Sequence, residues 1–114
     1  MNTSALFKVE IFVPADSLDE LLDALAEAGA GVIGNYDHCF AVTQVSSMFR
    51  PLEGANPTLG RVGELLTTGE SKVEVNVRED ILSEVIRVIR ENHPYEEPLI
   101  NIFPLANARY GGTL

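Results

Sequence analysis

Cysteine is almost absent from this sequence of 114 residues, because Cys39 is its single example and no disulfide can form within the chain. A lone cysteine fits a reducing compartment. No apolar stretch approaches the roughly 20 residues that a membrane-spanning helix needs. The first residues also lack the charged start and long apolar run of a secretory signal. From these absences we expect a cytoplasmic protein with no membrane partner.

Basic residues are also scarce. The chain has 8 Lys and Arg against 17 Asp and Glu, which gives a net charge of −9. Between Lys8 and Lys72 the only basic residues are Arg50 and Arg61. A surface of this charge repels nucleic acid phosphates and anionic lipids. We therefore expect no nucleic-acid partner.

The common catalytic signatures are missing as well. There is no phosphate-binding P-loop, no dinucleotide glycine fingerprint, no HExxH and no Gly-x-Ser-x-Gly. A nucleophilic pair of Cys39 with His38 or His93 is the one arrangement left, and no flanking signature supports it. The favoured interpretation of Cys39 is a small buried apolar residue. The residues by themselves thus indicate no class of enzyme.

An internal repeat is the clearest positive feature. Residues 8–25 match residues 72–89 at an offset of 64, with 7 identities in 18 positions. In each copy, alternating apolar residues predict a strand, at 8–13 and 72–77, and an apolar stripe at helical spacing then predicts a helix. Hydrophobic residues make up 46% of the chain, which suits one packed domain spanning residues 1–114.

The ends of the two predicted helices carry recognisable signals. Ser17 with Glu20 forms a candidate capping box for the first helix, or Asp16 is the cap, and Gly29 suits the residue that ends it. Asp80 is the expected cap of the second helix, and Pro94 forbids its continuation.

A strand is expected after each helix, near 32–36 or 40–45 in the first copy and at 99–103 in the second. The order βαββαβ predicts an α+β fold, the ferredoxin-like double split unit. Two helices cover one face of such a sheet, and the other face is polar, which suits either solvent or an oligomer interface. It carries Lys8, Glu10, Phe12, Lys72, Glu74 and Asn76.

The two copies differ most between residues 46 and 69, where the first copy holds a long insertion rich in Gly and Pro. Large apolar residues such as Phe49 and Leu59 argue that this loop is ordered. One interpretation is a lid or ligand-binding loop, in which Arg50 or Arg61 pairs with an anion. The other is a β-hairpin arm that packs against a neighbouring subunit.

The second helix is followed by the dense segment His93-Pro94-Tyr95-Glu96-Glu97-Pro98. His93 is interpreted either as a capping residue, charged at the helix C-terminus, or as a metal ligand with Glu96 or Glu97. Imidazole and carboxylate together suit zinc, copper or iron. We further expect the turns after both helices to lie at one end of the sheet, which would allow a site made of His38, Cys39, His93 and a carboxylate.

Three separated segments resemble the insert domain of the Nif-three-like family, the dinuclear-metal-centre hexameric proteins also called GTP cyclohydrolase type two homologues. They are residues 29–39 (GAGVIGNYDHC), 49–57 (FRPLEGANP) and 93–98 (HPYEEP). The His-Pro-Tyr-Glu segment is also similar to the end of the second helix in CutA, the divalent-cation-tolerance protein. These resemblances imply a CutA/PII-like fold that is often trimeric.

The larger metal-binding domain of the Nif-three-like family has no counterpart in this sequence. The resemblance therefore implies a stand-alone regulatory or binding domain rather than an enzyme. We expect a homo-oligomer, with a trimer favoured, that binds a small ligand, a protein or a divalent metal such as zinc or copper. The alternatives are a structural oligomerisation or protein-interaction domain with no ligand, and a small metal- or Cys-dependent hydrolase. The candidate ligand-binding residues are Arg50, Glu53, Asn56, Arg61 and Tyr95, and the candidate metal ligands are His38, His93, Glu96 and Glu97.

Overall fold

The two repeated apolar stretches form the two central strands of the sheet. In the computed structural model, which describes residues 5–111, β1 (Leu6–Val13) pairs antiparallel with β3 (Leu66–Arg78). Val9 lies opposite Val75. Residues directly opposite one another project on the same face, so this register places the apolar side of both repeats together.

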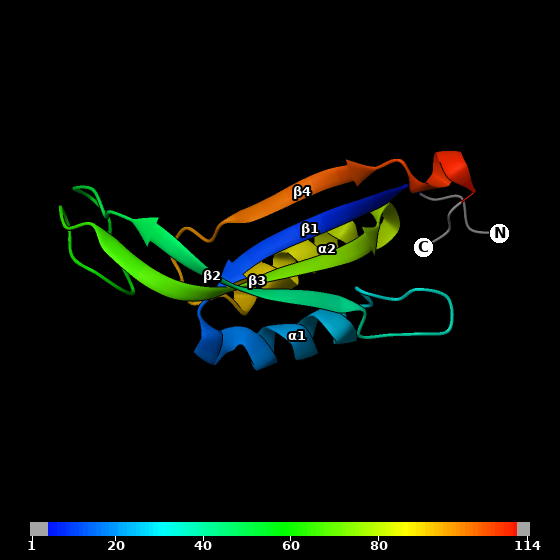
Figure 1. The fold of residues 1–114 in the computed structure, drawn as a ribbon, viewed down its shortest axis with the longest axis horizontal. Helices are drawn as coiled ribbons and strands as arrows, with labels where there is room; N and C mark the ends of the chain where they lie inside the picture. Colours follow the sequence, from blue (N-terminus) through cyan, green and yellow to red (C-terminus); the bar gives the residue numbers. More distant parts are fainter. Residues whose placement is uncertain (1–4, 112–114) are drawn as a thin grey trace.

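The remaining strands lie outside the central pair. β2 (Phe40–Phe49) pairs with β3, and β4 (Ile100–Leu105) pairs with β1, which gives the order β2-β3-β1-β4 (Figure 1). This order confirms the predicted ferredoxin-like fold. Of the two positions predicted for the strand after the first helix, the second is correct, since β2 begins at Phe40. The segment 32–36 holds only an isolated bridge between Ile33 and Tyr36, inside a turn.

Both helices cover the apolar face of the sheet (Figure 1). They are α1 (Leu18–Glu27), which follows the short 3₁₀ turn Ala15–Ser17, and α2 (Glu79–Glu91). A second 3₁₀ turn, Asn107–Tyr110, follows β4. Each fully buried aliphatic side chain contributes roughly 1.5–3 kcal/mol. The core consists of Val9, Ile11, Val13, Leu21, Leu25, Ala30, Val73, Val75, Val77, Val85 and Ile89.

The predicted helix N-caps are wrong, whereas Gly29 follows the end of α1 with a left-handed φ of 92°, as predicted. Ser17 occupies the N-cap position of α1 without a side-chain hydrogen bond, because its backbone is folded into the 3₁₀ turn and its N–H donates to Pro14. Neither Asp16 nor Glu20 completes a cap there. β3 runs directly into α2, so Arg78 takes the N-cap position and Asp80 lies inside the first turn. The first N–H of α2, on Glu79, donates instead to the carbonyl of Ala5.

The uncovered face of the sheet is polar, as predicted. The Lys8 ammonium lies 2.9 Å from the Glu74 carboxylate and 5.1 Å from the centre of the Phe103 ring. Lys72 lies 3.8 Å from Glu10. These four charges are therefore paired across neighbouring strands.

The insertion of the first copy forms a hairpin arm. β2 and β3 extend past the helices and are joined by the loop 50–65, which we call the arm loop (Figure 1). The molecule consequently measures 51 × 24 × 22 Å. The hairpin form expected in one interpretation is thus confirmed, while its packing against a neighbouring subunit stays a prediction. No helix within residues 5–111 is long and apolar enough to cross a membrane.

Candidate functional site

The arm loop is tied to the turn after α2, residues 92–99, which we call the α2–β4 turn. The hydroxyl of Thr58 donates to the Pro94 carbonyl at 2.8 Å, and the N–H of Asn56 donates to the Glu96 carboxylate at 3.3 Å. Backbone bonding also folds the loop on itself, since the N–H of Gly63 donates to the Pro51 carbonyl at 2.8 Å. These contacts bring together two segments about 40 residues apart in the sequence.

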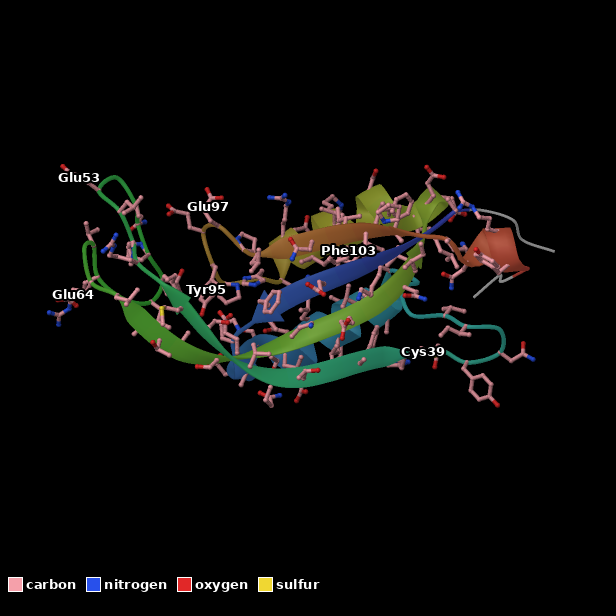
Figure 2. The ribbon with its side chains drawn as sticks, turned by 45° about the horizontal axis from the view of Figure 1, so that its top comes forward. Cys39, Glu53, Glu64, Tyr95, Glu97 and Phe103 are labelled. Carbon is pink, nitrogen blue, oxygen red and sulfur yellow. The ribbon has the colours of Figure 1, made fainter. Side chains whose placement is uncertain are left out.

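A groove of about 510 Å³ lies between the arm loop and the α2–β4 turn. Figure 2 shows Tyr95 and Glu97 on the turn that faces the base of the arm. The rings of Phe49 and Tyr95 are 6.1 Å apart, at the separation of an aromatic pair. The apolar walls include Phe12, Phe49, Pro51, Pro57, Leu59 and Leu99, and the polar lining includes Arg50, Glu70, Tyr95, Glu96 and Glu97.

Two polar groups of the groove, the Glu70 carboxylate and the Tyr95 hydroxyl, are buried near one another with no cation paired to them among residues 5–111. Glu70 is only 5% exposed, and no ion pair within residues 5–111 includes it. The hydroxyl of Tyr95 is buried and has no hydrogen-bond partner among the described residues. Burial, followed by the nearby Glu70 carboxylate, raises the pKa of Tyr95 to about 12. Buried polar groups are rarely left unpaired, so this pair marks the groove as unusual.

His93 has a structural role beside the groove. Its Nε2 lies 2.7 Å from the carbonyl oxygen of Phe12, and its Nδ1 accepts the N–H of Tyr95 at 3.2 Å. An Nδ1 that accepts a hydrogen bond must carry a lone pair rather than a proton. The ring is therefore neutral, with its proton on Nε2. Burial lowers the pKa of His93. The expected charged cap is therefore wrong, and Asn92 bonds the last turn of α2 through Val88 instead.

His38 and His93 lie at opposite ends of the sheet, which corrects the expectation of one shared end. The repeats run antiparallel, so the turn after α1 lies near the start of β1, where the Gly31 N–H donates to the Asn76 carbonyl. Figure 2 shows Cys39 at the end away from Tyr95. Within one chain, His38, Cys39 and His93 therefore do not form a combined site.

The other predicted site residues are divided by the fold. Arg50, Tyr95, Glu96 and Glu97 line the groove, and Asn56 borders it through its bond to Glu96. Glu53 and Arg61 lie on the arm loop outside the groove lining. The exposed His38 pairs with Asp37 at 3.0 Å. Within residues 5–111, no three His, Cys, Asp or Glu side chains are grouped as a metal site requires.

Sequence reasoning missed Glu70, although the repeat held a signal for it. At the offset of 64, Glu70 falls on Leu6, which is buried to the same extent in the first copy. An acidic residue at the position of a buried leucine is a departure from the scaffold. Phe12, placed on the polar face, also belongs to the groove.

Comparison with known proteins agrees with the resemblance of the three sequence segments. No family model matches the chain. A GTP cyclohydrolase 1 type 2 homolog of Halalkalibacterium halodurans is 41% identical over 106 residues, which are 93% of this chain and 28% of that protein. Its counterpart in Bacillus subtilis is 37% identical over 103 residues, 90% of this chain and 28% of that protein.

Solved structures give the same result. A Bacillus cereus protein related to NIF3 has a TM-score of 0.81 at 35% identity over 91% of this chain and 26% of its own. The periplasmic divalent cation tolerance protein CutA of Archaeoglobus fulgidus has a TM-score of 0.63 at 18% identity, over 88% of this chain and 83% of its own. The second likeness concerns the fold alone. The resemblance to the Nif-three-like family is thus confirmed, and this chain is homologous to one segment of those longer proteins.

Proposed function

We propose that this chain, as a homologue of one segment of the GTP cyclohydrolase 1 type 2 homologues, is a self-associating domain that binds a small ligand in the groove. The groove is the observation that carries the proposal. Its walls are apolar, and two neighbouring buried polar groups, on Glu70 and Tyr95, have no cation paired to them among residues 5–111. A concave apolar surface with a few convergent polar groups is the usual form of a ligand site.

An organic ligand suits the groove better than a metal ion. Both ring nitrogens of His93 are already engaged, and His38 directly precedes Cys39, which lies at the far end of the sheet from Tyr95. Zinc and copper sites normally need three or more ligands from the protein. Glu96 and Glu97 would remain as ligands, and no group of three exists among the described residues. Since solved proteins of this fold include divalent cation tolerance proteins, zinc and copper are the second candidates.

Self-association is supported by unpaired strand edges and exposed apolar side chains. β2 and β4 are the outer strands of the sheet, and open edges pair readily with other chains. Apolar groups are exposed on the arm at Met48, Leu52 and Leu65, and on and beside β4 at Leu99 and Phe103. Such patches are typical of contact surfaces. The proposed assembly is a homotrimer in the cytoplasm, with no catalytic step assigned to this chain.

One experiment tests the ligand site. A panel of small organic compounds, with Zn²⁺ and Cu²⁺ added separately, would be titrated into ¹⁵N-labelled protein and followed by amide chemical shifts. Binding should shift residues of the arm loop and the α2–β4 turn, and Phe49→Ala should weaken it. Val62→Ala, an exposed position on the same arm loop and outside the groove lining, is the matched control. Absence of shifts at the groove with every compound and metal would refute the ligand site.

Sedimentation equilibrium tests the assembly independently. The expected mass is that of three chains of 12.4 kDa each. A single chain at all concentrations would refute self-association and leave the ligand site standing.

A further inference from the structure

We propose that the groove selects an organic cation, an amidinium or ammonium group on a flat apolar body, and that the charged group pairs with Glu70. This inference rests on the proposed ligand site and names its chemistry. The ligand's charged end would lie between Glu70 and the hydroxyl of Tyr95, and its body would lie against the apolar walls.

Glu70 differs from the other carboxylates on the polar face of the sheet, because it has no cation beside it among residues 5–111. Glu74, on the same strand, pairs with Lys8 at 2.9 Å, and Glu10 lies 3.8 Å from Lys72. Glu70 is 5% exposed and takes part in no ion pair within residues 5–111. Burying a carboxylate is unfavourable unless a cation or hydrogen-bond donors meet it. The cation that the fold supplies to the other two carboxylates is missing at this position.

The hydroxyl of Tyr95 lies in the same part of the groove, and it has no hydrogen-bond partner among residues 5–111. Burial and the adjacent carboxylate keep this phenol neutral, since they raise its pKa to about 12. A neutral phenol oxygen accepts hydrogen bonds. An amidinium has N–H groups pointing in two directions, so one group can donate to Glu70 and another to Tyr95.

The charge and shape of the remaining groove lining also suit an organic cation. Glu70, Glu96 and Glu97 face a single positive side chain, Arg50, so the groove favours a cation over an anion. The rings of Phe12 and Phe49 and the side chain of Leu99 supply apolar surface for a flat body. Aromatic faces also attract cations.

The same chemistry exists in two sources, a free small molecule and an arginine side chain of another protein molecule, including a second copy of this chain. We commit to the free small molecule, because the groove lies inside one chain, between its own arm loop and its own turn. The second source is an outcome of the test below.

Benzamidine is the probe, with benzamide as its neutral isostere and benzoate as its anionic counterpart. Each would be titrated into the wild-type protein and followed by the amide shifts of Glu70, Tyr95 and Leu99. Benzamidine should bind at least about tenfold more tightly than benzamide, and benzoate should not bind. Glu70→Gln should remove this preference, Tyr95→Phe should reduce it, and Glu64→Gln, near the tip of the arm, should leave it unchanged (Figure 2).

Each result supports or overturns the inference. Equal binding of benzamidine and benzamide would overturn the selection for charge while leaving the ligand site intact. Failure of every probe, together with failure of the compound panel, would refute both proposals. A third result would be that the wild type does not bind benzamidine and that Glu70→Gln dissociates the assembly. It would show that a second copy of the chain fills the groove, and it would overturn the proposal of a free small molecule. The comparison of probes in the wild type needs no variant to fold.

Discussion

The Nε2 atom of His93 lies 2.7 Å from the carbonyl oxygen of Phe12, and this bond joins the end of α2 to the end of β1. On its other side, the imidazole accepts the backbone N–H of Tyr95 at 3.2 Å. One neutral ring therefore sets the position of the turn that carries Tyr95. The groove depends on this position, because Phe12 and Tyr95 both line it.

Acid should weaken the fold through His93. Burial lowers the pKa of this residue below its ordinary value of 6.5, so the unfolded chain takes up the proton more readily than the folded chain. The stabilising contribution is complete above about pH 6.5 and is lost as the pH falls toward the lowered pKa. Urea unfolding at pH 7.5 and pH 5 should show a larger loss of stability in the wild type than in His93→Gln. The exposed His38→Gln serves as control, and equal losses in all three proteins would contradict the assignment.

Truncation of the core at Leu25 should be costly. Leu25 is fully buried between α1 and the sheet, and Leu→Ala changes at such sites cost about 2–5 kcal/mol. Chemical denaturation of Leu25→Ala measures this loss. Val62→Ala, on the exposed arm loop, should change the free energy of unfolding by less than about 0.5 kcal/mol. Similar effects at both positions would show that the arm loop is packed in the free protein.

Gly31 and Gly34 form a matched pair in the turn after α1. Both have positive φ, of 74° and 56°. A Cβ at Gly31 would lie 2.8 Å from Cε1 of Phe40, whereas a Cβ at Gly34 would meet no atom within 4 Å. Alanine at either site carries the left-handed strain of about 1–2 kcal/mol. Gly31→Ala should cost at least about 1 kcal/mol more than Gly34→Ala, and equal costs would mean that Phe40 moves aside freely.

The hydroxyl of Thr58 should control the opening of the arm loop. Thr58→Val removes its hydrogen bond to Pro94 while keeping the shape of the side chain. A lost hydrogen bond of about 1 kcal/mol corresponds to roughly fivefold faster exchange of a protected amide. The amide of Asn56, which donates to Glu96, is the reporter. Thr67→Val, exposed on the arm, should leave its exchange unchanged, and a slower or unaltered rate in Thr58→Val would contradict this link.

The sequence was sufficient for the scaffold because periodicity reports burial directly. The alternation in residues 8–13 and 72–77 placed the central strands, and the offset between the copies implied two equivalent helices. Caps were less predictable, since β3 continues into α2 and Ala5 provides the acceptor that a capping residue would supply elsewhere. The sequence around a helix end does not indicate a hydrogen-bond partner that lies so far away in the chain.

The site was harder to predict because its parts come from distant segments. Tyr95, Arg50 and Glu96 stood out by residue type, and the fold does bring them to one groove. Glu70 stood within an ordinary-looking strand, and its lack of a cation is visible only once Lys8 and Lys72 are placed. The expected pairing of His38 with His93 failed because the strands of the two repeats are antiparallel. Equivalent turns of the two copies therefore lie at opposite ends of the sheet.

The most direct test of this account is the stability of the unliganded Glu70→Gln protein, measured by urea denaturation at pH 7.5 beside Glu74→Gln. The two residues lie on the same strand and face, but only Glu74 has a cation, Lys8, at 2.9 Å. If Glu70 is an unpaired carboxylate kept for a ligand cation, Glu70→Gln should stabilise the free protein by about 1 kcal/mol, the lower end of the cost of an unpaired buried group. Glu74→Gln should bring no such gain. A Glu70→Gln protein that is less stable than the wild type would contradict the account, because Glu70 would then already have its partner inside the fold.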